Sequence, residues 1–184
     1  MNFFRKKNRS NIHLNIDDRS SVSIGEDCTA ANAHFTALEG AQITVADNCT
    51  LGSLYVFAMA GARISVGYGC SFNGAVRLLA HEDASIHIGA HCLFAGGTDV
   101  TISDMHSIID LNTNERINTA KDVFIDEHVW TGNGAMILKG ARIGKNSIIG
   151  AGSIVTGNIP SECLAVGTPA KVIRTNVNWN FDLI

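Results

Sequence analysis

The sequence contains few prolines and no long apolar run. Pro160 and Pro169 are the two prolines among 184 residues, and both lie near the C-terminal end. Because proline cannot donate to a strand ladder, we expect regular strand pairing to stop there. The longest apolar run extends from Leu54 to Ala62, whereas a membrane-spanning helix needs ~18–20 apolar residues. No transmembrane segment is therefore expected.

Net charge is also low. The formal net charge is −3, which argues against nucleic acid and against an anionic membrane surface as partners. Residues 1–9 are basic, but no apolar stretch follows them, so a secretory signal is not expected. We therefore expect a cytoplasmic protein, and the length of the chain favours a single domain over residues 1–184.

One short phrase recurs along the first half of the chain. It runs from an aliphatic residue to a cysteine, and its copies begin 21, 21 and 22 residues apart, at Ile24, Val45, Val66 and Ile88. The period then shortens to six residues, and the hexads open at Ile125, Thr131, Ile137, Ile143, Ile149 and Val155. A hexapeptide period is typical of a parallel β-helix. Three sides then make a triangular coil of ~18 residues, and the longer period adds a longer corner.

The cysteines define the expected inward face of these coils. Four of them, Cys28, Cys49, Cys70 and Cys92, occupy the same small, inward position of the repeat. Because successive coils stack ~4.8 Å apart, we expect a column of buried, reduced thiols. Cys163 is expected to stand outside this column. The same register predicts that His34 also points inward.

The period divides the chain into segments. Coils are expected from Ile12 to Asp104 and again from Val123 to about Val155. The stretch between them breaks the period and is rich in Asn, Thr and charge, which predicts a loop extruded from the helix. Loops on a rigid scaffold are where function concentrates. The remaining segments are a polar lead-in at 1–11, the extruded loop at 105–122 and a C-terminal short helix or arm at 171–184.

The histidines raise the question of a metal site, but their spacing argues against one. His87 and His91 are the closest pair, with His81 or His106 as a third ligand. Residues four apart on a strand lie ~13 Å apart. That separation is too long for two Zn–N bonds of ~2.0–2.1 Å to one ion. No metal is therefore expected.

Three stretches near the C-terminal end resemble a known family. Residues 129–138, 143–156 and 165–174 are similar to the hexapeptide-repeat acetyltransferases, in particular the galactoside, maltose and colanic-acid enzymes and the capsular polysaccharide O-acetyltransferases. The resemblance is strongest over 99–175. It implies an all-β, left-handed parallel β-helix of hexapeptide repeats with one extruded loop and a short C-terminal arm. It also implies a homotrimer with active sites shared between subunits.

The resemblance further implies individual site residues. His106, at the root of the loop, matches the family's general base, and Trp130 matches a tryptophan near the reacting centre. Acetyl-CoA, the acetyl donor, would be bound by Gly132, Asn133, Ala151 and Thr156 along its pantetheine and by Lys171 and Arg174 at its phosphates. The backbone N–H of Gly132 is also a candidate donor to the tetrahedral oxyanion. Two positions depart from the family pattern: Thr131 puts a hydroxyl inward, and Gly157 stands where some relatives carry a basic residue.

These parts predict an acetyl-CoA-dependent O-acetyltransferase acting on a carbohydrate of a bacterial surface polysaccharide, capsular or lipopolysaccharide. A neutral His106 imidazole would take the proton of the attacking hydroxyl and return it to the departing thiolate. Asp104 is a candidate to orient that imidazole. Two alternatives stay open: N-acetylation of an amino sugar or antibiotic, and a non-catalytic β-helical assembly subunit. The last would leave His106 and the basic pair Lys171 and Arg174 unexplained.

Overall fold

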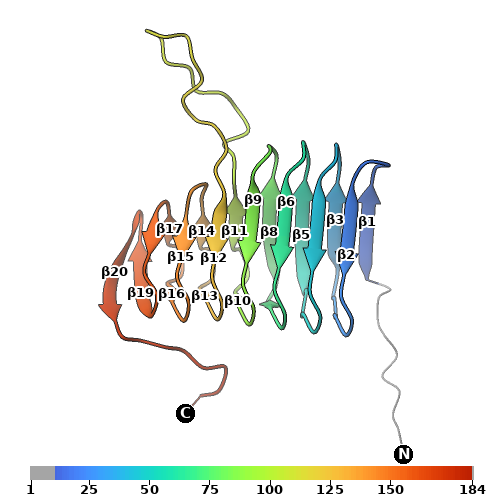
Figure 1. Ribbon diagram of the computed structural model, residues 1–184. Coiled ribbons are helices and arrows are strands. Elements are labelled where there is room, and N and C mark those ends of the chain that lie inside the picture. Colours follow the sequence, from blue (N-terminus) through green and yellow to red (C-terminus); the bar gives the residue numbers. More distant parts are fainter. Residues whose placement is uncertain (1–10, 184) are drawn as a thin grey trace, which may run out of the picture.

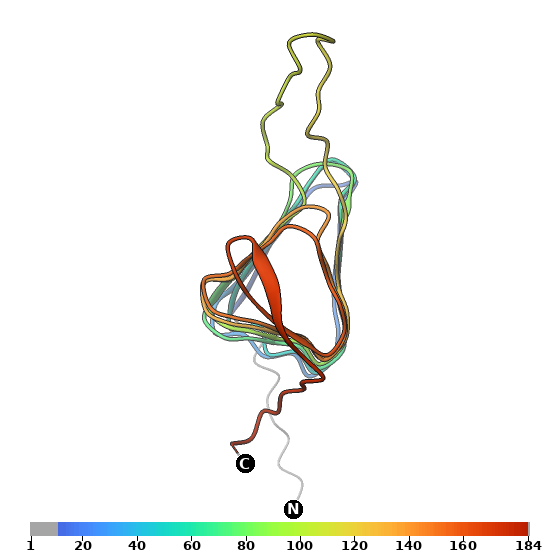
Figure 2. The same ribbon diagram turned by 90° about the vertical axis from the view of Figure 1, so that its left-hand side faces the viewer.

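The computed structural model describes residues 11–183, which wind into a three-sided parallel β-solenoid (Figure 1). The outline in the end view is triangular (Figure 2). Each coil passes through sheet A and then sheet B, and from Ser71 onward it also adds a strand to sheet C before the circuit repeats along the solenoid axis. This confirms the predicted all-β, parallel β-helix. Within the described residues there is no helix long and apolar enough to cross a membrane.

The three sheets are built from short strands. Sheet A contains β1 (Ile12–Ile16), β3 (Ala33–Ala37), β5 (Ser53–Ala58), β8 (Ala75–Ala80), β11 (Asp99–Thr101), β14 (Met136–Ile137) and β17 (Ile154–Val155). Sheet B contains β2 (Ser21–Ile24), β4 (Gln42–Val45), β6 (Arg63–Val66), β9 (Ser85–Ile88), β12 (Val123–Ile125), β15 (Arg142–Ile143) and β18 (Asn158–Ile159). Sheet C contains β7 (Ser71–Phe72), β10 (Leu93–Phe94), β13 (Trp130–Thr131), β16 (Ile148–Ile149), β19 (Cys163–Gly167) and β20 (Ala170–Thr175).

Alternation along each strand separates the core from the surface. In β5, Leu54, Val56 and Ala58 are buried, whereas Tyr55 between them is 40% exposed. Fully burying a side chain such as Val or Leu stabilises the fold by ~1.5–3 kcal/mol. Parallel pairing sets each inward residue over its equivalent in the next coil, as in the stacked rings of Phe72 and Phe94, whose centroids are 4.9 Å apart. The core is therefore a set of columns that run along the solenoid.

The vertex between sheets B and C repeats one backbone conformation in every coil. The residue directly before the small inward position has a left-handed φ in each case: Asp27 (53°), Asn48 (59°), Gly69 (67°), His91 (57°), His128 (55°), Asn146 (60°) and Glu162 (58°). Asn, Asp and Gly adopt this region most easily, and His is also enriched there. The residue before each cysteine in the repeated phrase, which is Asp, Asn, Gly or His, therefore marks a turn.

The predicted cysteine column is confirmed. Cys28, Cys49, Cys70 and Cys92 are all buried and reduced. Each thiol donates to a backbone carbonyl of the following coil, for example Cys70 Sγ to the Gly89 carbonyl at 3.1 Å. Burial raises the pKa of the Cys28 thiol, which keeps it protonated and able to donate. The column therefore satisfies carbonyl groups that point into the core.

The expectation that Cys163 stands outside the column was wrong. Ile148 pairs with Leu164, so the residues that precede them, Ser147 and Cys163, also lie in register. Cys163 is 2% exposed and occupies the same inward position as the other four cysteines. Val129 and Ser147 fill the two intervening coils, which interrupts the run of cysteines in the sequence but not the column.

The inward placement of His34 was also wrong. Ala33 and Phe35 are buried, so strand alternation turns His34 to the outer face of sheet A. There its ring stacks on His13, with centroids 4.5 Å apart. Phe35 fixes this register because its large apolar ring must be buried in the core.

The solenoid continues beyond the predicted end at Val155. Strands β18 and β19 complete another coil, and β20 then folds back antiparallel to β19 (Figure 1). Lys171 and Arg174 therefore lie on a strand, so of the two forms expected for 171–184, a short helix or an arm, the helix is wrong. Pro160 does not end the coils because it lies at a vertex between strands. Residues 176–183 follow as the C-terminal arm.

We predict that all five cysteines resist labelling in the native protein. A thiol reagent should modify them at least ~100-fold more slowly than in the unfolded chain, because each is buried and thiolates are the reacting species. The variant Thr50→Cys, at an exposed position beside Cys49, should label rapidly and serve as the control. Rapid native labelling of Cys163 would contradict its place in the column.

Candidate active site

The extruded loop, residues 105–122, projects from the vertex between sheets A and B (Figures 1 and 2). Its outgoing and returning arms pair through an antiparallel bridge between Ile109 and Arg116. Its base is closed where the Lys121 N–H donates to the Ile102 carbonyl at 3.1 Å. His106 lies exposed at the root of the outgoing arm. The loop thus presents an imidazole to solvent from a closed base.

Six polar residues hold the root of the loop, and we call them the loop-root cluster: Glu82, Ser103, Asp104, Arg116, Asn118 and Lys139. Arg116 forms a bidentate ion pair with Glu82, with N–O distances of 2.6 and 2.8 Å. Arg116 and Ser103 lower the pKa of the Glu82 carboxyl to about 2. Glu82 belongs to the preceding coil and Lys139 to the following one, so the cluster spans three coils.

Asp104 is directed into this cluster. Its carboxylate accepts from Lys139 Nζ and, at 2.7 Å, from Asn118 Nδ2. The hydrogen bond from Lys139, followed by that from Asn118, lowers the pKa of Asp104. The hydrogen-bond partners of Asp104 are therefore Lys139 and Asn118, and this geometry does not support Asp104 as the group that orients the His106 imidazole.

Trp130 lies on the outer face of sheet C and is 38% exposed. Its neighbour is Trp179 of the C-terminal arm, with ring centroids 6.1 Å apart. Trp179 is itself anchored, because it stacks on His128 at 4.3 Å and its Nε1 donates to the His128 carbonyl at 2.8 Å. Sequence reasoning missed this contact because the arm carries no repeat. Sheet C lies opposite the vertex that carries the loop (Figure 2), so one chain does not bring His106 and Trp130 together.

Gly132, Asn133 and Ala151 lie along the vertex between sheets C and A. A Cβ on Gly132 would lie 2.5 Å from the backbone nitrogen of Ala151, so successive coils approach closely at this point. The side chains of Asn133 and Ala151 are exposed on the same edge. The Gly132 N–H already donates to the Ile149 carbonyl at 2.7 Å. It is therefore not free to stabilise an oxyanion, contrary to expectation.

The remaining predicted cofactor residues divide between two places. Lys171 pairs with Val166, whose side chain packs against Gly150, so Lys171 continues the edge on which Ala151 lies. Arg174 pairs with Leu164, further across sheet C. Thr156 follows β17 at the vertex between sheets A and B, on the edge that carries the loop. The structure thus groups Gly132, Asn133, Ala151 and Lys171 and separates Arg174 and Thr156 from them.

The two departures from the family pattern have simple structural consequences. Thr131 is fully buried, and its hydroxyl lies 3.3 Å from that of Thr98. The Thr98 hydroxyl also donates to the Ala95 carbonyl at 2.8 Å, so the inward polar pair is satisfied. A Cβ on Gly157 would meet nothing within 4 Å.

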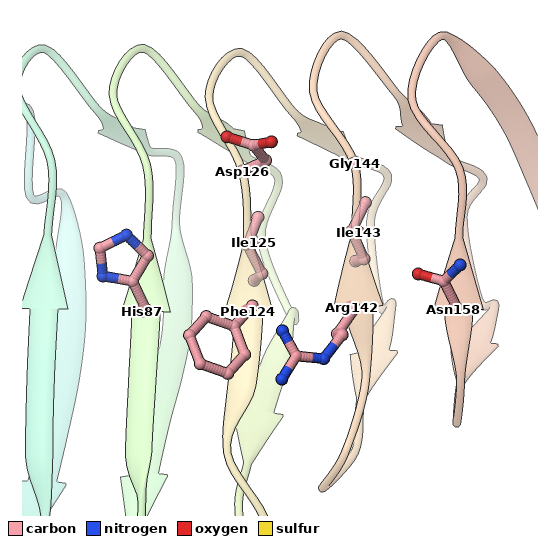
Figure 3. Close-up of a pocket in the computed structure, with 8 residues that line it drawn as sticks. All are labelled: His87, Phe124, Ile125, Asp126, Arg142, Ile143, Gly144 and Asn158. Atoms are coloured by element: carbon pink, nitrogen blue, oxygen red, sulfur yellow. The ribbon is translucent and has the colours of Figure 1, made fainter.

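A shallow hollow lies on the outer face of sheet B, away from the predicted site residues (Figure 3). His87, Phe124, Arg142 and Asn158 line it from four neighbouring strands. The Arg142 guanidinium carbon lies 4.1 Å from the centroid of the Phe124 ring. Because this cation–π contact occupies a face of the ring, and none of the predicted site residues lines the hollow, we do not place the reaction there.

Known proteins are similar to this chain in both sequence and fold. Residues 122–157 match the family model for the bacterial transferase hexapeptide (six repeats). The polysialic acid O-acetyltransferase of Escherichia coli O1:K1 / APEC is 37% identical over 98 residues, 53% of this chain and 32% of that protein. The galactoside O-acetyltransferase of Lactococcus lactis is 44% identical over 94 residues, 50% of this chain and 44% of that protein. The chain thus spans less than half the length of these two relatives.

The crystal structure of the polysialic acid O-acetyltransferase OatWY has the same fold. It superposes with a TM-score of 0.80 at 26% identity, over 95% of this chain and 90% of that one. The predicted left-handed parallel β-helix and the resemblance to hexapeptide-repeat acetyltransferases are therefore confirmed.

We predict that Gly132→Ala destabilises the solenoid, whereas Gly157→Ala does not. The new Cβ at 132 would press on backbone of the next coil, and such overpacking costs ~1–3 kcal/mol. The same methyl at 157 enters open space, so its effect should stay within ~0.5 kcal/mol. Urea denaturation of both variants measures the difference. Equal stabilities would contradict the close approach at the Gly132 vertex.

Proposed function

We propose that this protein is an O-acetyltransferase that transfers the acetyl group of acetyl-CoA to a hydroxyl of a carbohydrate, with His106 as general base. The observation that carries the proposal is the similarity to two O-acetyltransferases of carbohydrates, combined with an exposed imidazole at the root of the loop. The acceptor that we propose is a sugar of a bacterial surface polysaccharide, modified in the cytoplasm by this single domain.

The chemistry needs one group that can accept and return a proton. A neutral His106 imidazole removes the proton of the acceptor hydroxyl as its oxygen attacks the thioester carbonyl. When the tetrahedral intermediate collapses, the imidazolium protonates the departing thiolate of coenzyme A. The acetyl group moves from sulfur to oxygen, and the histidine ends in its starting state.

The vertex between sheets C and A is the proposed cofactor edge. Asn133 and Ala151 are exposed there one coil apart, and Lys171 continues the same edge toward the C-terminal end. The exposed Asn133 and Ala151 side chains leave room for a linear pantetheine along this edge, and a lysine suits a phosphate. We therefore propose that acetyl-CoA lies lengthwise along this edge, with its phosphates at Lys171, whereas Arg174 and Thr156 lie away from this edge.

The catalytic loop and the cofactor edge lie on different vertices of one chain. We propose a homotrimer in which His106 of one subunit meets Trp130 and the cofactor edge of its neighbour. A cyclic trimer joins unlike surfaces of adjacent copies, which is what such a shared site requires.

We predict that His106→Ala lowers turnover by ~10²–10⁴ under saturating substrates, the usual effect of losing a general base. Thiol release from acetyl-CoA with a panel of sugars and amino sugars measures turnover and separates hydroxyl from amine acceptors. The control is His87→Ala, an exposed histidine on sheet B that should leave turnover within about twofold because surface substitutions perturb folding little. Retention of more than about a tenth of the activity by His106→Ala would place the base elsewhere.

We predict that His106→Ala and Trp130→Ala each lower turnover alone, and that the two variant chains complement each other when mixed and refolded together. Random mixing into trimers would restore about a quarter of the sites, since each site takes one residue from each of two neighbours. Light scattering on the same samples reports the assembly. A monomer, or no recovery in mixed trimers, would contradict the shared site.

A further inference from the structure

Asn118 is a buried polar residue at the centre of the loop-root cluster. Its exposure is 7%, although the extruded loop on which it lies is otherwise largely exposed. A buried amide is costly unless its hydrogen-bonding groups are satisfied, and a satisfied one fixes local geometry. The hydrogen-bond partners of the Asn118 amide therefore indicate its structural role.

The side-chain amide joins the two arms of the loop around His106. Its Nδ2 donates to the His106 carbonyl at 2.8 Å and to Asp104 Oδ2 at 2.7 Å. Its Oδ1 accepts from the Ile108 N–H at 2.7 Å and from Arg116 Nε at 3.2 Å. One side chain on the returning arm thus binds the backbone at His106 and again two residues later.

The amide is itself braced against the solenoid. Lys139 Nζ donates to the Asn118 carbonyl at 2.9 Å and also binds Asp104. Arg116, which bonds the amide oxygen, is held by Glu82 of the preceding coil. The backbone of His106 is therefore tied through Asn118 to coils on both sides of the loop.

We infer that Asn118 is a positioning residue that fixes the backbone of His106 relative to the solenoid, so that the imidazole reaches its acceptor in one orientation. This inference rests on the proposed role of His106. Small displacements of a catalytic group, of about 1 Å, can lower a rate ~10²-fold. Asn118 would thus act on turnover while touching neither substrate.

The test compares Asn118→Ala and Asn118→Asp with Asn112→Ala, which changes an exposed asparagine nearer the loop tip. Both Asn118 variants lose the two donated hydrogen bonds, and the carboxylate introduced by Asn118→Asp would also repel Asp104. We expect kcat to fall ~10²-fold, with KM for acetyl-CoA within about threefold and the thermal midpoint of the solenoid unchanged. Amide exchange at residues 106–108 should accelerate in both variants, and Asn112→Ala should match wild type in every measurement.

Three results would overturn the inference: wild-type kcat in both Asn118 variants, unchanged exchange at 106–108, or a parallel loss of kcat, KM and thermal stability, which would indicate a general structural role. The exchange measurement distinguishes this failure from failure of the proposed function. If His106→Ala stays active while amide exchange accelerates in Asn118→Ala, Asn118 does hold the backbone at 106–108, but the general base is another residue. The positioning role of Asn118 in catalysis is then wrong together with the proposed mechanism.

Discussion

Each strand must hydrogen-bond to its equivalent in the next coil, and the rest of the structure follows from that constraint. Parallel pairing places every inward side chain about 4.8 Å from its own counterpart, so the core consists of columns of like residues. A polar residue in an otherwise apolar column needs a hydrogen-bond partner nearby. The buried hydroxyl of Thr131 follows Phe94 in its column and meets the hydroxyl of Thr98.

The same constraint decides where function can be added. A strand cannot be interrupted without breaking two ladders, but a vertex can be extended, and the extruded loop occurs at one. The ladder continues past it, because Val123 pairs with Ile86 of the coil before the loop. The extruded loop lies outside the core, so core packing does not fix its position. Polar contacts at its root must fix it instead. The ion pairs of Glu82 and Lys139 anchor the root to neighbouring coils, and Asn118 transmits that anchoring to His106.

Periodicity explains which features the sequence could predict. The hexads and the cysteine phrase predict the coils and the position of the loop. A side-chain pattern that repeats along the sequence indicates that the same position of the coil, buried or exposed, also repeats. Contacts outside the repeat leave no such pattern: Glu82 and Arg116 are 34 positions apart, and Trp179 and His128 are 51 apart. The missed place of Cys163 shows a related limit, since two coils without cysteine conceal the column in the sequence.

The three-sided shape also limits what one chain can do alone. The loop leaves the vertex between sheets A and B, whereas the exposed Asn133 and Ala151 follow the vertex between sheets C and A. Movement of the loop cannot bring these edges together if its root is held across three coils, as the loop-root cluster holds it. A rigid root therefore favours assembly over loop closure as the way to complete the site. In the proposed mechanism, the loop-root contacts that fix His106 within the chain are also the reason that a neighbouring copy would supply the cofactor edge.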